Sequence, residues 1–295
     1  MTISTIKTNG INIRVLELKN DSNETIVFLH YGGATLGVWN GVIPYFKDNY
    51  HIIAQDLRCH GFTDKPLDKC HIDDMAKDLA GILDKLGVEK TKIVGSSMGA
   101  DVAISFAANY PQRVNCLVLD GGLYDIVGSD SKDQILTEEE IEKAKNDLKQ
   151  RILSRPREFF ETREGYITKN KEGWEKYFPW SEIIKKATED EITKENGKFT
   201  SPQSSEEVWA YIEPLYNVRF INYFKKITCP ILWLPDEKEK DHEVVIRNLK
   251  KFSQKLKYCK IVTLEGSVHA YTCLLRPKEF SEEILQFYDE IKGKK

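Results

Sequence analysis

The sequence predicts an α/β fold, in which a mostly parallel sheet is flanked by helices. Short apolar runs, typical of strands buried on both faces, alternate with segments whose apolar residues recur at helical spacing. The chain has 295 residues and is 41% hydrophobic, which is enough for a substantial core. Residues 95–99, Gly-Ser-Ser-Met-Gly, join an apolar run directly to a helical pattern. We expect the rest of the chain to be organised around this turn.

The N-terminal part of the chain shows the alternation clearly. Residues 2–8 and 11–18 alternate apolar and polar around Asn9-Gly10, which predicts a β-hairpin. A helix is expected at residues 74–86, where Gly87 ends the pattern. Buried strands are expected at residues 25–29, 51–54, 92–94 and 114–119.

The pattern changes between residues 123 and 227. Charged helical stretches, for example 137–153 and 205–216, dominate this segment, and no buried strand is apparent. Its many aromatic residues are expected to form mostly its own core. Strands at 229–234 and 260–264 and a helix at 277–291 then resume the alternation. We therefore expect a core formed by residues 1–122 and 228–295, with 123–227 as an inserted helical cap domain.

Composition narrows the classes of partner and compartment. The net charge of −3 and the pI near 6.1 give no basic surface, so nucleic acid is not an expected partner. No apolar run has the length of a membrane helix, and the first residues lack the pattern of a secretory signal.

The six cysteines form no Cys-x-x-Cys pair, which favours reduced thiols in a cytoplasmic protein. Cys59-His60 and Cys70-His71 lack zinc-site spacing, so no metal is expected. The sequence carries no indication of oligomeric state.

The turn at residues 95–99 has the form of a nucleophile elbow. In such a turn a serine between a strand and a helix is held in a strained conformation, and its hydroxyl projects from the sheet. Glycines on both sides let the strand and helix approach closely. Ser97 is thus the candidate nucleophile, and the backbone N–H of Met98 is a candidate donor to an oxyanion.

A serine nucleophile needs a base, and the base needs an orienting acid. Ligands bind beyond the carboxyl ends of the strands in sheets of this type, so the partners are expected in strand-end loops. His269 follows the last expected strand and is the candidate base.

Four motifs in order give the sequence a resemblance to the α/β-hydrolase superfamily, in its form with a helical cap. Residues 30–33 (His-Tyr-Gly-Gly) resemble its oxyanion turn, 56–61 (Asp-Leu-Arg-Cys-His-Gly) its Asp-x-Arg-Gly-x-Gly loop, 95–99 its elbow and 266–269 its Gly-x-Gly-His turn. The resemblance covers roughly two-thirds of the chain and implies Gly32 as the second oxyanion donor. Tyr31 and Cys59 stand where the family usually has glycine.

The acid is expected in the loop after the strand at 229–234. By the family's spacing, a count from Pro230 favours Glu239 and a count back from His269 favours Asp241. Asp241 is the first choice, because residues 241–244 resemble the family's entry into the next helix. Asp120, at the end of an earlier strand, is the third candidate, since some relatives carry the acid there.

Other polar residues in these motifs have structural interpretations. His30 is expected to bond neighbouring loops. Asp56 and Arg58 are expected to brace their turn as an ion pair. Ser96 is expected to hydrogen-bond near the site without acting as the nucleophile.

These features together predict a serine hydrolase that needs no cofactor. The resemblance implies a carboxylesterase acting on a small to medium, mainly apolar ester. A serine in the elbow argues against dehalogenases and epoxide hydrolases, which use a carboxylate nucleophile. Hydrolysis of an amide, lactone or carbon–carbon bond, perhydrolysis, and a small-molecule receptor without turnover are the alternatives.

Overall fold

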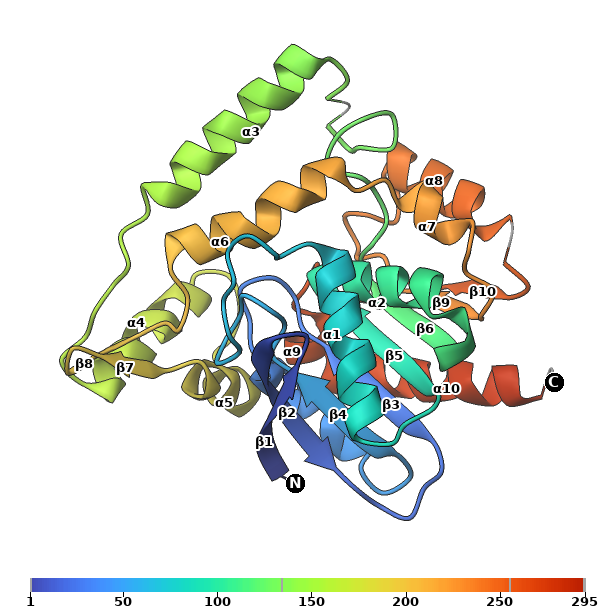
Figure 1. Cartoon of the computed structure of the whole chain (residues 1–295), viewed down its shortest axis with the longest axis horizontal. Helices are drawn as coiled ribbons and strands as arrows, with labels where there is room; N and C mark the ends of the chain where they lie inside the picture. Colours follow the sequence, from blue (N-terminus) through green and yellow to red (C-terminus); the bar gives the residue numbers. More distant parts are fainter. Residues whose placement is uncertain (1, 134, 255, 294–295) are drawn as a thin grey trace.

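A central eight-stranded sheet organises the structure, a computed structural model that describes residues 2–133, 135–254 and 256–293 (Figure 1). The strand order is β1-β2-β4-β3-β5-β6-β9-β10. β1 with β2 and β2 with β4 are antiparallel, and the remaining neighbours are parallel. The strands are β1 (Thr2–Thr8), β2 (Ile11–Leu18), β3 (Thr25–Leu29), β4 (His51–Gln55), β5 (Thr91–Ser96), β6 (Val114–Asp120), β9 (Ile231–Trp233) and β10 (Cys259–Ile261). The expectation of a mostly parallel sheet flanked by helices is confirmed.

Helices follow most of the strands, as the alternating pattern predicts. The α-helices are α1 (Ile72–Lys85), α2 (Met98–Asn109), α3 (Glu138–Leu153), α4 (Arg163–Trp174), α5 (Glu182–Asp190), α6 (Ser205–Ile212), α7 (Phe220–Phe224), α8 (Glu243–Ser253), α9 (Thr272–Leu275) and α10 (Pro277–Lys292). The 3-10 helices are η1 (Leu36–Gly41), η2 (Ile43–Tyr45), η3 (Pro111–Arg113) and η4 (Glu213–Asn217).

The sheet is buried on both faces. Along β3, Val27 and Leu29 pack into one apolar cluster with α1, α2 and α8, whereas Ile26 and Phe28 pack into another with η1, η2 and α10. All four side chains are completely buried. This explains why the strand is a continuous apolar run, since both of its faces contact helices.

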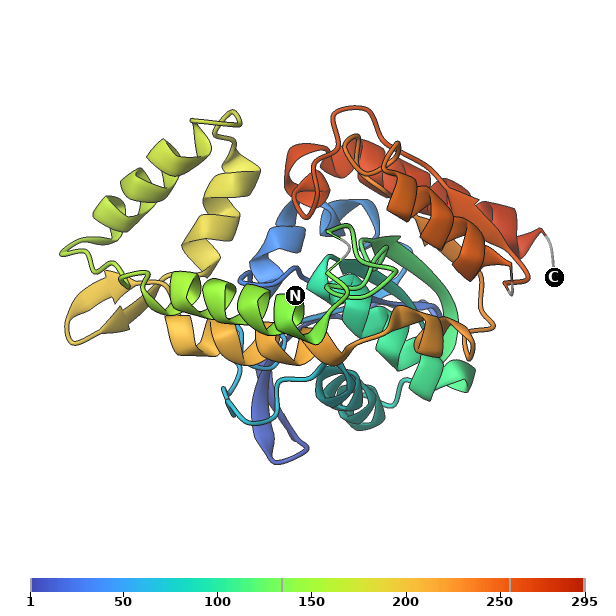
Figure 2. The same ribbon diagram turned by 90° about the horizontal axis from the view of Figure 1, so that it is seen from above.

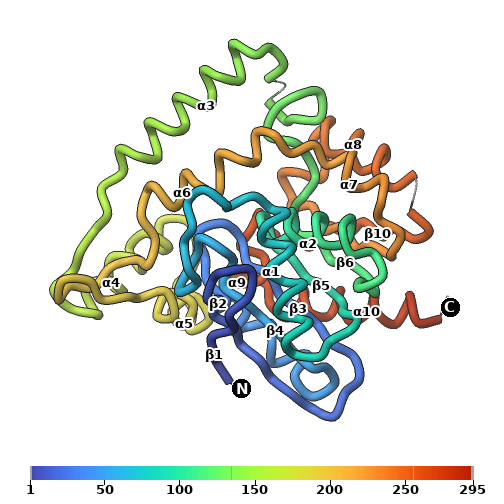
Figure 3. The backbone as a smooth tube through the Cα atoms, viewed as in Figure 1, coloured from blue at the N-terminus to red at the C-terminus, as the bar shows by residue number. Residues whose placement is uncertain are grey.

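The chain leaves the sheet after β6 and returns to it at β9, and the intervening segment forms α3 to α7 (Figure 3). α3 begins at a capping box formed by Thr137 and Glu140. α3 and α6 pack side by side and extend across the top of the molecule (Figures 1 and 2). The segment also contains a small hairpin, β7 (Thr193–Glu195) and β8 (Lys198–Thr200), which the sequence pattern did not predict.

A network of charged residues joins this segment to the sheet. Arg14 on β2 donates to both carboxylate oxygens of Asp190, the last residue of α5, at 2.9 and 2.6 Å. The hydroxyl of Thr35 also donates to Asp190, at 2.7 Å. Arg14 contacts Asp56 as well, at 3.3 Å. Paired donors to one carboxylate fix an orientation, so this network holds the end of α5 against the core.

Two expectations about the loop after β4 are wrong. Asp56 and Arg58 do not pair with each other, because Arg58 points toward α1 and donates to both oxygens of buried Asp78, at 2.7 Å each. The thiols are not all reduced, since Cys59 and Cys70 form a disulfide across this loop.

Among the described helices, none is long and apolar enough to cross a membrane.

We predict that Asp190→Ala lowers the free energy of unfolding by about 1.5–3 kcal/mol, because Arg14 and Thr35 lose a charged acceptor. Urea denaturation measures this loss. Asp147→Ala, on the exposed surface of α3, is the control for removing one carboxylate. Equal stability of the two variants would show that the network does not hold the segment.

Candidate active site

The turn between β5 and α2 holds Ser97 in a strained conformation. Its φ of 49° and ψ of −116° lie in a region that residues with a side chain rarely adopt. A Cβ on Gly95 would lie 2.3 Å from the carbonyl oxygen of Gly99, and a Cβ on Gly99 would lie 2.1 Å from that of Leu29. The N–H of Ser97 donates to the carbonyl of Asp120 at 2.6 Å, which ties the turn to β6. Close packing of glycine backbone therefore sustains the strain.

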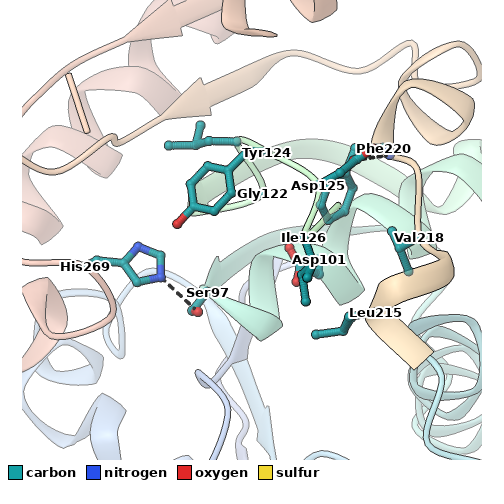
Figure 4. A pocket seen from close by; sticks show the side chains of 11 residues that line it. Ser97, Asp101, Gly122, Tyr124, Asp125, Ile126, Leu215, Val218, Phe220 and His269 are labelled. Carbon is teal, nitrogen blue, oxygen red and sulfur yellow. Dashed lines mark hydrogen bonds between the residues drawn. The ribbon is translucent and has the colours of Figure 1, made fainter. Parts of the chain in front are cut away.

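His269 lies beside Ser97, although the two residues are 172 positions apart in sequence. Its Nε2 is 3.1 Å from the Ser97 hydroxyl oxygen (Figure 4). The backbone N–H of His269 donates to a carboxylate oxygen of Asp236 at 2.8 Å, which fixes the loop after β10. This distance places the two candidate catalytic groups within hydrogen-bonding reach.

Glu239 is the acid next to the other nitrogen of the ring. Its Oε1 lies 3.4 Å from Nδ1 of His269, and its side chain is 2% exposed. The hydroxyl of Tyr124 donates to the same carboxylate at 3.3 Å. Burial alone would raise the pKa of Glu239, but His269, the N–H of Asp236 and the charge of Lys132 together outweigh it, and the pKa is lowered. Burial likewise lowers the pKa of His269, but the nearby carboxylates, Glu239 first, outweigh it and the pKa is raised.

The structure does not bring Asp241 to His269. Asp241 is exposed just before α8, and it does not cap that helix either, because His242 takes the N-cap position. Glu239 is directed inward by a tight turn in which its N–H donates to Oδ1 of Asp236 at 2.7 Å. The first choice of Asp241 is therefore replaced by Glu239, which the count from Pro230 favours.

Asp120, the third candidate, is buried at the end of β6. It accepts a hydrogen bond from Ser96 at 2.9 Å, so Ser96 bonds near the site as expected. Burial raises the pKa of Asp120 to about 7. Its charge contributes less than that of Glu239 to raising the pKa of His269. Asp120 thus supports the serine turn, because its side chain accepts a hydrogen bond from Ser96 and its carbonyl accepts one from the N–H of Ser97.

Asp236 and Tyr124 are site residues that sequence reasoning did not identify. Asp236 has a recognisable signal, because Pro235-Asp236 directly after a strand is typical of a turn in which the aspartate accepts backbone N–H groups. Tyr124 has no such signal, since its position depends on how the chain continues after β6.

The two residues that carry the candidate oxyanion donors lie next to each other. A Cβ on Gly32 would be 3.8 Å from Cβ of Met98, which places the two backbones side by side. Nε2 of His30 accepts from the N–H of Leu57 at 2.9 Å, and its Nδ1 hydrogen-bonds to the carbonyl of Tyr31 at 2.7 Å. His30 therefore joins neighbouring loops as expected, and it orients the turn that carries Gly32.

A cavity of about 180 Å³ opens beside Ser97 and His269 (Figure 4). Its other lining residues come from α2, from the chain after β6 and from the chain before and within α7: Asp101, Gly122, Leu123, Tyr124, Asp125, Ile126, Leu215, Val218 and Phe220. Within the described part of the chain, no group of three or more histidine, cysteine, aspartate or glutamate side chains is placed to hold a metal ion. The cavity is large enough for a group the size of a benzene ring, which fits an engineered cavity of about 150 Å³.

Comparisons with known proteins bear on the family and the fold. The family model described as the alpha/beta hydrolase fold matches residues 24–265. A solved structure of E-2-(acetamidomethylene)succinate hydrolase superposes with a TM-score of 0.79, covering 98% of this chain and 99% of that one, at 22% identity. A thioesterase domain from the curacin biosynthetic pathway has a TM-score of 0.77 at 15% identity, covering 97% and 99% of the two chains. These likenesses show the fold.

Curated relatives match over shorter stretches. A 2-hydroxy-6-oxononadienedioate/2-hydroxy-6-oxononatrienedioate hydrolase of Comamonas testosteroni is 34% identical over 127 residues, which are 40% of this chain and 43% of the relative. The 3-oxoadipate enol-lactonase 2 of Acinetobacter baylyi is 31% identical over 94 residues, covering 32% of this chain and 35% of the relative. The matched stretch is thus less than half of either relative's length.

We predict that Glu239→Gln lowers the pKa of His269, because it removes the negative charge that most strongly favours the protonated ring. Asp241→Asn is the matched control and is expected to leave the pKa of His269 unchanged. NMR titration of the histidine rings measures both. A larger fall in the pKa of His269 in Asp241→Asn than in Glu239→Gln would show that Asp241, and not Glu239, is the acid beside the ring.

We predict that Gly99→Ala destabilises the fold by about 1–3 kcal/mol or more, because the new Cβ would overlap the Leu29 carbonyl. Gly173→Ala is the control, since a Cβ on Gly173 meets no atom within 4 Å and alanine favours the helix. Thermal and urea denaturation compare the two variants. Comparable stability would mean that the elbow is less tightly packed than described.

Proposed function

The chain belongs to the α/β-hydrolase fold family, and on that premise we propose that it is a serine hydrolase acting on a carboxylic ester. The observation that carries this proposal is the 3.1 Å contact between the hydroxyl of Ser97 and Nε2 of His269 at a strained turn. Strain of this kind is found where a structure must present a reactive group.

In the proposed reaction, the Ser97 oxygen attacks the ester carbonyl while Nε2 of His269 takes its proton. The N–H groups of Gly32 and Met98 bind the oxyanion, a contribution of roughly 3 kcal/mol per donor. The intermediate collapses to an acyl-serine, and the leaving alcohol takes the proton from His269. Water then attacks the acyl group while His269 accepts its proton. The bond between the acyl carbon and the Ser97 oxygen breaks, the carboxylic acid leaves, and His269 returns the proton to Ser97. No cofactor takes part in these steps.

Glu239 holds the imidazole and stabilises its protonated form in this scheme. Its position against Nδ1, its burial and its lowered pKa support the role. Tyr124 and the N–H of Asp236 donate to its carboxylate, each at 3.3 Å, and so limit the directions it can take.

We assign residues 123–227 the role of a cap over the site. Leu215, Val218 and Phe220 from this segment line the cavity beside Ser97. Their apolar side chains favour a small, mainly apolar substrate group, in keeping with the cavity's volume of about 180 Å³.

Hydrolysis of a lactone or of a carbon–carbon bond is the second candidate. It is favoured by the names of the two curated relatives, a hydrolase of an oxo-dienedioate and an enol-lactonase. Both reactions require water activation and oxyanion binding, which the same residues would supply.

We predict that a fluorophosphonate probe labels Ser97 and that the protein turns over short-chain aryl esters. Ser97→Ala should remove labelling and lower kcat/KM by at least about 10³-fold, because the nucleophile is lost. Ser96→Ala is the matched control at the neighbouring serine and should still be labelled. Peptide mass spectrometry and an ester and lactone panel give the readouts.

The outcomes separate the candidates. Turnover of lactones but not of aryl esters would select the second candidate. Labelling of Ser97 without turnover of any compound would favour a receptor. Absence of labelling in the folded wild-type protein would contradict a reactive serine.

A further inference from the structure

The cavity beside Ser97 contains a carboxyl group that the proposed mechanism does not use. Asp101 lies on α2, where its backbone N–H donates to the carbonyl of Ser97 at 3.1 Å. The two residues are thus about one helical turn apart, roughly 5–6 Å along the axis. Figure 4 shows Asp101 beside Ile126 and Leu215, which line the same cavity.

The carboxyl of Asp101 is unpaired among the residues that the structure describes. Its side chain makes no hydrogen bond or ion pair with any of the described residues, although protein encloses it closely. The residue keeps partial accessibility, as expected for a group that faces a cavity. Burial raises the pKa of Asp101 to about 8, against the charge of His269 and with a contribution from Asp125. Enclosing a carboxyl group without a hydrogen-bond partner costs free energy. A ligand that pairs with the carboxyl can remove that cost.

The charges around this group favour a cation. Of the described residues that line the cavity, none is a lysine or arginine, whereas Asp101 and Asp125 are both acidic. Asp125 already has partners, since it accepts from the N–H of Phe220 at 2.9 Å and lies 3.9 Å from Arg219.

His269 does not supply the missing cation in the reacting state. Its protonated form lowers the pKa of Asp101. A general base must be neutral when it takes the proton of Ser97, so at that stage Asp101 faces no positive charge from His269. A positive charge on the substrate would complete the site.

Resting on the proposed function, we propose that Asp101 is a specificity-determining residue, which binds an ammonium group carried by the substrate near the reacting carbonyl. The apolar side chains of Leu123, Ile126, Leu215, Val218 and Phe220 surround the carbon atoms of that group. The substrate is therefore a small ester with one amine end. Dianionic substrates, such as the dienedioate in the name of one relative, suit this cavity poorly.

The first test measures binding without catalysis. Calorimetry with Ser97→Ala compares benzylamine with benzyl alcohol, a neutral ligand of the same size. Benzylamine should bind at least tenfold more tightly, and Asp101→Asn in the same background should remove most of that preference. Asp147→Asn is the control for the loss of one carboxylate. Asp101→Ala replaces Asp101→Asn if the latter fails to fold.

The second test measures turnover by the wild-type protein and Asp101→Asn. The 4-nitrophenyl ester of β-alanine carries an ammonium group, and 4-nitrophenyl butyrate is its neutral isostere. The ratio of their kcat/KM values should favour the β-alanine ester at least tenfold in the wild type. Asp101→Asn should lower that ratio about tenfold or more.

The outcomes distinguish the specificity site from the proposed function. Selective benzylamine binding that depends on Asp101, without labelling or turnover, would support the ammonium site and contradict the hydrolase. Turnover of both esters with a ratio near one, unchanged in Asp101→Asn, would overturn the ammonium site and leave the hydrolase standing. Tighter binding of benzyl alcohol than of benzylamine would also overturn it.

Discussion

The close contact of two glycines with the neighbouring backbone is the constraint on which the rest of the site depends. Gly95 and Gly99 let α2 approach the end of β5 and the carbonyl of Leu29 to distances that no Cβ would allow. That approach holds Ser97 at a positive φ and places its hydroxyl above the carboxyl edge of the sheet. The loops that follow β9 and β10 bring Glu239 and His269 to the same edge. The candidate catalytic residues are therefore all positioned by the sheet and its strand-end loops.

Two parts of the chain contribute differently to the candidate site. The sheet and its loops carry the candidate catalytic groups, whereas the chain after β6 and the chain around α7 supply most of the cavity wall. The ion pair of Arg14 with Asp190 holds another part of the same insertion against the core. We infer that substrate choice depends on how residues 123–227 are positioned relative to Ser97 and His269, which the sheet and its loops hold in place. Asp101 lies between these two parts, because it belongs to α2 and faces the cavity.

Much of the fold could be predicted, because buried strands and the glycine turn leave strong local patterns. The juxtaposition of Ser97 and His269 also followed from their positions at strand ends. The choice between Glu239 and Asp241 did not, because the turn made by Asp236 decides which side chain points inward. The partner of Arg58 was missed for a similar reason, since Asp78 comes from α1 rather than from the same loop. Pairing across elements depends on packing, which local spacing does not encode.

A crystal structure with phenylboronic acid bound would test the assembled centre most directly. Boron should be bonded to the Ser97 oxygen, with one boronate oxygen about 2.7–3.1 Å from the N–H groups of Gly32 and Met98. Glu239 should lie against Nδ1 of His269 in the same complex. A boronate attached elsewhere, or one bound to Ser97 with its oxygen turned away from Gly32 and Met98, would contradict the proposed centre.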